Sequence, residues 1–270
     1  MRSRNMAATA ALILVCAAGC STTPTTPSTS AAAGAGPEAT VPAANQAPAV
    51  ECTPSTASAG KVLRGSASYD YDPFESISEA VAKVDVAVSG RIISWSAGRS
   101  IIDGDDATRF AVAEISVDDS FAGDIGRTIY VSVDLGSEGL DAEGKPVPDG
   151  DGSSTVLTLD EVSAAAPAGI GVLFLGAQNP SPKEEAYGDD VRVVDARAGL
   201  PDGATLYAAY PQGFLLEGCD GSVSSALADD EDIDPWVATA AAESKADEIT
   251  STRSEDSFEL LLEAAGTSGR

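Results

Sequence analysis

The chain has 270 residues and a formal net charge of −26, from 42 acidic and 16 basic side chains. Such a charge repels nucleic acid and anionic lipid headgroups, so neither is expected as a partner of the folded region. The sequence contains no histidine, which removes the commonest general base and excludes both a Ser-His-Asp triad and a Cys-His dyad. We therefore expect a protein that is not an enzyme.

The first 19 residues have the pattern of a signal peptide. Arg2 and Arg4 precede an apolar run over residues 6–18, which is shorter than the roughly 20 residues that a permanent membrane-spanning helix needs. The run ends in Ala17-Ala18-Gly19-Cys20, which resembles the lipobox of bacterial lipoproteins. In that family the cysteine becomes a diacylglyceryl cysteine, the leader is removed, and the new amino terminus is often acylated, for example with palmitate. The resemblance implies a lipid anchor at Cys20 and a place on the extracytoplasmic face of the cell membrane. A plain secretory signal is the alternative.

The next segment is too polar to form a core. Residues 20–50 consist mainly of Ser, Thr, Pro, Ala and Gly without apolar periodicity, so we expect a disordered tether. A β-rich domain is expected over residues 51–227. Residues 228–270 are expected to form an acidic segment followed by C-terminal helices.

Cleavage of the leader would leave three cysteines in the exported chain. With Cys20 lipidated, Cys52 and Cys219 remain, and two leftover cysteines outside the cytoplasm usually pair. We expect a Cys52–Cys219 disulfide that ties the start of the folded region to a late strand. Two free thiols, or pairing with another chain, are the alternatives.

The folded region is expected to begin with a helix. Asp72 suits the N-cap, Pro73 suits the first helical position, and Glu75 stands three residues after the cap. Residues 84–95 then alternate between apolar and polar, as in a strand. A change of phase at Gly90 predicts a β-bulge.

Five further segments have strand patterns. Residues 128–135 alternate most clearly, which directs Ile129, Val131, Val133 and Leu135 inward, and residues 170–175 are continuously apolar, as in a strand buried on both faces. The other segments are residues 109–117, and residues 206–210 with 214–217, which flank an expected tight turn at Pro211-Gln212-Gly213.

Two helices are expected after the β region. Asp234-Pro235-Trp236 is a cap-like start for the first, and Asp256 with Glu259 is a cap for the second. The second helix has one apolar stripe, ended by Gly266, and we expect this stripe to pack on the β domain rather than on a partner protein.

The order of these strands resembles a set of secreted bacterial proteins that carry an OB-like small barrel. The resemblance rests on KVDVAVSGRIISW, RFAVAEISV, TIYVSVDLG, PAGIGVLFLGA and LYAAYPQGFLLEG, within residues 74–225. It implies a mainly β fold, an OB-like small β-barrel of about five to six strands with one N-terminal and one or two C-terminal helices. It brings no catalytic residues, and barrels of this type bind many kinds of ligand.

One acidic segment has the spacing of a calcium loop. Asp149, Asp151 and Ser153 stand at positions one, three and five, and Asp160 stands at position twelve. Position six is serine instead of glycine, so an acidic insertion without metal is the alternative. A second acidic turn contains three carboxylates, Asp103, Asp105 and Asp106.

These observations lead to a lipid-anchored, extracytoplasmic, non-enzymatic interaction module, with the membrane as one partner and a protein or the cell wall as the other. The alternative is a domain that binds calcium or a small ligand through its acidic loops. No other cofactor is expected. Trp95 and Tyr210 could form a ligand platform, although such residues more often serve in packing.

Overall fold

The computed structural model describes residues 53, 58–65, 70–147, 155–179, 191–247 and 256–268. The chain divides into two units, Met1–Ala44 and Asn45–Arg270, and every described residue belongs to the second. The expected signal peptide and tether, including Cys20, therefore lie outside the described residues.

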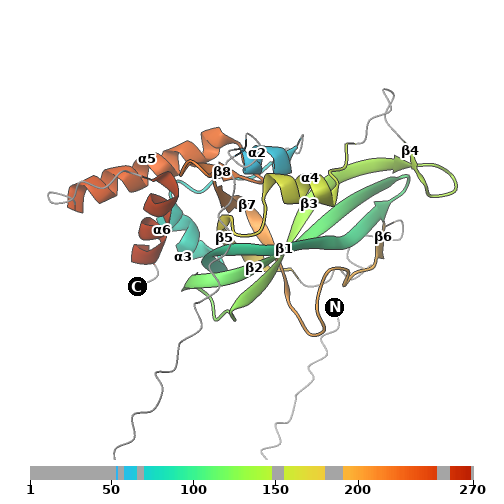
Figure 1. Cartoon of the computed structure of the whole chain (residues 1–270), viewed down its shortest axis with the longest axis horizontal. Coiled ribbons are helices and arrows are strands. Elements are labelled where there is room, and N and C mark those ends of the chain that lie inside the picture. The colour runs from blue at the N-terminus through green and yellow to red at the C-terminus, as the bar shows by residue number, and fades with distance from the viewer. Residues whose placement is uncertain are drawn as a thin grey trace, which may run out of the picture. The chain divides into compact units, whose positions relative to one another are not determined.

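Five strands form a closed barrel (Figure 1). The strands β1 (Val86–Asp103), β2 (Asp106–Ala122) and β3 (Thr128–Leu140) form an antiparallel meander. β3 pairs in parallel with β7 (Leu206–Glu217), and β7 pairs with β5 (Gly171–Gln178), which returns to β1. The fold is thus mainly β and contains an OB-like small barrel, as the sequence predicted.

Alternating side chains fill the barrel. Ile129, Val131 and Val133 of β3 point into the core, as expected, together with Val172 and Phe174 of β5. Two short helices add their apolar sides to this core, α2 (Ala59–Arg64) and α4 (Leu159–Ala165). The barrel is therefore a packed core and not an open lumen in the part of the chain described.

A helical layer covers the β5–β7 side of the barrel (Figure 1). It consists of α3 (Ile77–Lys83), α5 (Asp230–Asp247) and α6 (Ser257–Ser268). Leu173 and Leu175 of β5 pack against these helices, whereas Val172 and Phe174 face the barrel interior. This confirms that residues 170–175 form a strand buried on both faces, and that the last helix packs on the barrel.

Three short strands complete the sheet. β4 (Pro146–Val147) pairs with β3, and β6 (Val191–Val194) pairs with the far end of β1. β8 (Val223–Ser225) pairs with β7. The register between β1 and β2 shifts between Ser89 and Gly90, which confirms the predicted bulge. None of the helices in the described ranges has the length and apolar character needed to cross a bilayer.

Four local expectations were wrong. The helix α3 begins at Ile77, with Ser76 as its N-cap, so Asp72 and Pro73 lie before it in a segment without regular secondary structure. Pro211-Gln212-Gly213 is not a turn between two strands, because β7 runs continuously through it with an irregularity in its pairing to β5. α5 begins before Pro235, which lies inside the helix, and α6 continues past Gly266.

Candidate functional site

The outward-facing residues of β1, β2 and β3 form the best candidate surface, here called the outer polar face. Since the inward positions of these strands are apolar, the alternate positions point away from the core. The outer polar face comprises Ser94, Ser96, Glu114, Tyr130, Ser132 and Asp134.

A carboxylate and two hydroxyls meet at its centre. The strand register places Ser94 opposite Glu114 and Glu114 opposite Tyr130. The Ser94 hydroxyl donates to Glu114 Oε2 at 2.8 Å, and the Tyr130 hydroxyl donates to Glu114 Oε1 at 3.4 Å. Desolvation raises the pKa of Tyr130, and the Glu114 charge adds to this, so the phenol stays a donor at neutral pH. This group offers hydrogen bonds and one negative charge to a partner.

Two further polar residues of β3 lie beside this centre. The Ser132 hydroxyl is buried and has no hydrogen-bond partner among the residues described. Asp134 accepts a hydrogen bond from the Gly136 N–H at 2.7 Å, and burial raises the pKa of its carboxyl. Asp134 lies opposite Phe110 of β2, whose ring packs against the buried Arg99 guanidinium at 5.4 Å.

The segment before β7 covers one edge of this face. The Gly199 carbonyl accepts a hydrogen bond from Ser96 Oγ at 3.3 Å. A Cβ on Gly199 would lie 3.0 Å from Val112, and the glycine has a positive φ of 75°. The segment therefore lies close against β1 and β2, whereas Ser94 and its neighbour Ile93 remain exposed.

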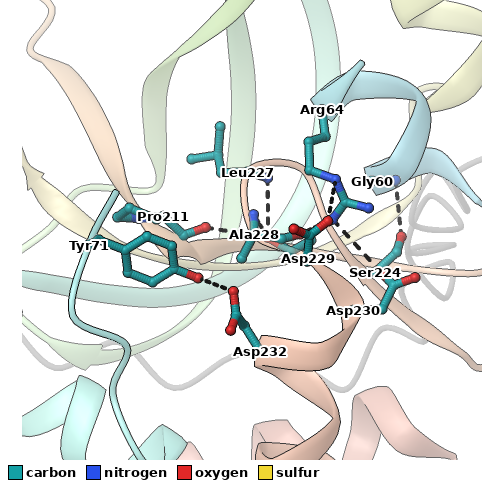
Figure 2. A network of polar contacts seen from close by, with 11 residues as sticks. Gly60, Arg64, Tyr71, Pro211, Ser224, Leu227, Ala228, Asp229, Asp230 and Asp232 are labelled. Carbon is teal, nitrogen blue, oxygen red and sulfur yellow. Dashed lines mark hydrogen bonds and ion pairs between the residues drawn. The ribbon is translucent and has the colours of Figure 1, made fainter. Parts of the chain in front are cut away.

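A second polar cluster joins segments that are far apart in the sequence (Figure 2). Arg64 of α2 lies 3.5 Å from Asp229 and 3.9 Å from Asp230, and it donates to the Ala228 carbonyl. The Tyr71 hydroxyl donates to Asp232 at 2.6 Å. Desolvation raises the pKa of Tyr71, and the hydrogen bond to Asp232 raises it further.

Hydrogen bonds between two serine hydroxyls and backbone groups extend this cluster. The Gly60 N–H donates to the Ser224 hydroxyl at 3.0 Å, and the Ser225 hydroxyl accepts from Leu227 and Ala228 N–H groups while donating to the Pro211 carbonyl (Figure 2). The acidic residues at the start of α5 thus bind Arg64 of α2 and Tyr71, and these contacts stabilise the packing of both segments near β7 and β8. We assign this cluster a structural role.

Most of the residues predicted for calcium lie outside the described residues, namely Asp149, Asp151 and Ser153. Asp160 is exposed in the first turn of α4. The carboxylates of Asp103, Asp105 and Asp106 are exposed at the β1–β2 turn, and nowhere in the described ranges do three His, Cys, Asp or Glu side chains gather as a metal site. The loop at 149–160 stays a prediction, and the three carboxylates of the second acidic turn do not come together as a metal site among the residues described.

The structure describes only one of the two cysteines of the predicted disulfide. Cys52 lies outside the described residues, while Cys219 lies between β7 and β8 and is not free. Their pairing stays a prediction. Of the expected platform residues, Trp95 packs on the core and donates to the Ala166 carbonyl at 2.7 Å, and Tyr210 is 38% exposed beside Phe74. Trp95 and Tyr210 therefore pack against different parts of the domain.

The outer polar face was not among the sites predicted from the sequence. Its only sequence signal is the polar half of the alternation over residues 128–135, where Tyr130, Ser132 and Asp134 occupy the outward positions. Searches for similar proteins add no precedent for this surface: no protein family, curated protein or solved structure matches the chain.

Proposed function

We propose that the protein is a lipid-anchored, extracytoplasmic interaction module without catalytic activity, and that its outer polar face contacts a protein or cell-wall partner. The observation that carries the proposal is the arrangement of the barrel surface. Helices α3, α5 and α6 pack over β5 and β7, whereas exposed side chains remain on β1 beside Glu114 and Tyr130.

The chemistry of this face favours a hydrogen-bonding partner. Glu114 provides a carboxylate, Ser94 and Tyr130 provide hydroxyls, and exposed Ile93 provides a small apolar contact. Peptide amides and sugar hydroxyls suit the Glu114 carboxylate and the Ser94 and Tyr130 hydroxyls, because both kinds of partner present closely spaced hydrogen-bond donors and acceptors. The negative charge favours partners that are neutral or cationic.

Anchoring supports this role but rests on the sequence alone. A diacylglyceryl group at Cys20 would hold the domain at the membrane, and the segment at 20–50 would let it reach a partner. In a Cys20→Ser variant we expect loss of thiol acylation and of membrane association. Normal processing and unchanged detergent partitioning of that variant would contradict the anchor.

The interaction is tested by site-specific photocrosslinking in cells. A photoreactive residue at Ser94 of the full-length lipoprotein should give a discrete crosslinked product, identified by mass spectrometry. The same residue at Gln178, exposed at the end of β5, is the control.

A second change tests the chemistry of the face. Glu114→Gln should reduce the yield of the Ser94 product while leaving the melting temperature close to that of the wild type. Equal products from positions 94 and 178, or a yield that Glu114→Gln does not change, would contradict the outer polar face as the interface.

A further inference from the structure

Part of the outer polar face is covered by a segment of the chain itself. Residues 195–204, here called the covering segment, directly follow β6 and lie against β1 and β2. The Ser96 hydroxyl donates to the Gly199 carbonyl at 3.3 Å. A Cβ on Gly199 would lie 2.7 Å from Ser96 Oγ and 3.0 Å from the Val112 side chain. The covering segment is therefore in direct contact with outward side chains of two strands.

These side chains belong to one row that crosses three strands. The register places Ser96 opposite Val112 and Val112 opposite Ser132, and directly opposed residues share a face of the sheet. Val112 is only 3% exposed, although its neighbours Ala111 and Ala113 point into the barrel core and Val112 joins neither core in the part of the chain described. The Ser132 hydroxyl oxygen is buried as well and has no hydrogen-bond partner among the residues described. An outward row is shielded in this way only when another segment lies on it.

The covering segment is bound to this row weakly. Its hydrogen bond from Ser96 to Gly199 is long for a hydroxyl donor. The segment's other hydrogen bonds within the described ranges are internal, such as those from Arg197 Nη2 to the carbonyls of Pro201 at 3.0 Å and Ala204 at 3.2 Å. Each residue from 195 to 204 also keeps part of its surface exposed. Segments with so few buried contacts open at a lower free energy than the whole domain.

Both ends of the covering segment have a backbone conformation suited to a hinge. Asp195 follows β6 and has a φ of 51°, the one positive φ of a residue other than glycine in the described ranges. Gly203 stands shortly before β7 and has a φ of 75°. Hinges are formed by a few residues at the ends of elements that absorb changes of φ and ψ. Changes at these two positions would move the covering segment and leave the pairing of β6 and β7 intact.

We propose that the covering segment is an autoinhibitory cover of the outer polar face, and that the partner binds fully only after the segment has lifted from Ser96, Val112 and Ser132. This inference rests on the proposed function, because it concerns the regulation of the same face. Lifting adds two hydroxyls and one apolar side chain to the exposed part of the face, in the row next to Glu114. It also frees the Ser132 hydroxyl, whose unsatisfied burial destabilises the closed state and which an amide or hydroxyl of the partner would satisfy.

Thiol labelling of the full chain measures the opening without any partner. A Ser132→Cys variant is alkylated with iodoacetamide, and peptide mass spectrometry distinguishes this thiol from the native cysteines. Ser94→Cys gives the rate at an exposed position of the same face, and Val131→Cys gives the rate in the barrel core. The Ser132→Cys thiol should react at least about tenfold slower than the first and at least about tenfold faster than the second. A rate equal to either reference would overturn the proposal.

A methyl group at Gly199 should lift the covering segment. Gly199→Ala places this group against Ser96 and Val112 and should speed the labelling of the Ser132→Cys thiol by at least about fivefold. Gly203→Ala is the matched control, because Gly203 has the same φ of 75° but its methyl group would meet open space. The control gives the effect of backbone strain alone and should speed the labelling less. Equal labelling rates in the two variants would overturn the proposal.

Photocrosslinking in cells tests the regulation. With the photoreactive residue at Ser94, Gly199→Ala should raise the yield of the crosslinked product above that of Gly203→Ala. An unchanged or lower yield would overturn the regulation and leave the proposed function standing. If no product forms in any variant, the proposed function fails and the regulation fails with it, whereas the labelling rates still decide whether the covering segment opens.

Discussion

Gln212 is the buried side chain whose loss gives the sharpest prediction. It is 1% exposed, and its amide joins β7 to two other segments. Its Oε1 accepts from the Phe74 N–H at 2.6 Å, and its Nε2 donates to the Asp232 carbonyl at 3.0 Å and more weakly to the Phe74 carbonyl at 3.4 Å. One amide thus joins the segment before α3 to the first turn of α5.

The change Gln212→Met keeps the volume and removes all three hydrogen bonds. The Phe74 carbonyl still accepts from Trp236 Nε1 at 2.9 Å, so the main loss is the Phe74 N–H, left unsatisfied at a cost of about 1–3 kcal/mol. Loss of the bond to Asp232 costs about 1 kcal/mol more. A total of about 3 kcal/mol corresponds to a fall in Tm of roughly 6–12 °C for a domain of this size.

Thermal unfolding followed by circular dichroism measures this effect. Gln178→Met is the matched control, because Gln178 is exposed at the end of β5 and the same change there should leave the Tm within about 1–2 °C of the wild type. If the two variants have equal melting temperatures, the amide does not connect these segments in the way described.

Three further predictions concern the barrel and its closure. Gly90→Ala places a methyl group on a backbone oxygen of β2 and should destabilise the domain by at least about 2 kcal/mol in urea unfolding. The control variant Gly126→Ala places its methyl group in open space and should change the stability by less than about 0.5 kcal/mol. Equal unfolding midpoints of the two variants would refute the packing argument. Thr158→Ala removes the capping box of α4 and should cost about 1 kcal/mol in the same assay, and an unchanged midpoint would show that α4 does not need its cap. Mass spectrometry under non-reducing conditions should find Cys52 joined to Cys219, and free thiols at both positions in fresh protein would exclude the disulfide.

The strands were the most predictable part of the fold. Alternation over residues 128–135 and the continuous apolar run at 170–175 report burial directly, because side chains on a strand point to opposite faces. The bulge at Gly90 was visible for the same reason, since an extra residue changes the phase of the alternation.

Helix boundaries depended on contacts that the sequence does not display. Asp72 and Pro73 form a good local start signal, but the Phe74 N–H and carbonyl bond to the side chains of Gln212 and Trp236, and the helix begins later with Ser76 as its cap. Helix α4 has a local signal of its own, the capping box of Thr158 and Glu161, which indicates a helix start where the calcium-loop spacing ends.

The outer polar face was not predictable from single segments. Ser94, Glu114 and Tyr130 belong to three different strands, and their contact depends on the register between them. An alternating pattern tells which positions face outward, but it does not tell which residue of one strand stands beside which residue of the next.

The parallel pairing of β3 with β7 has a consequence for the order in which the chain can assemble. Tyr130 on the edge of β3 pairs with Leu206 of β7. The Gly60 N–H of α2 bonds to the Ser224 hydroxyl, which lies 164 residues later in the chain. A polypeptide that emerges amino terminus first therefore displays an unfinished three-stranded meander, in which the β1 edge stays open until β5 appears and the β3 edge stays open until β7 appears. Factors that delay release of the carboxy-terminal part would prolong this vulnerable stage, and strand-swapped or aggregated products would form from the free edges of β1 and β3.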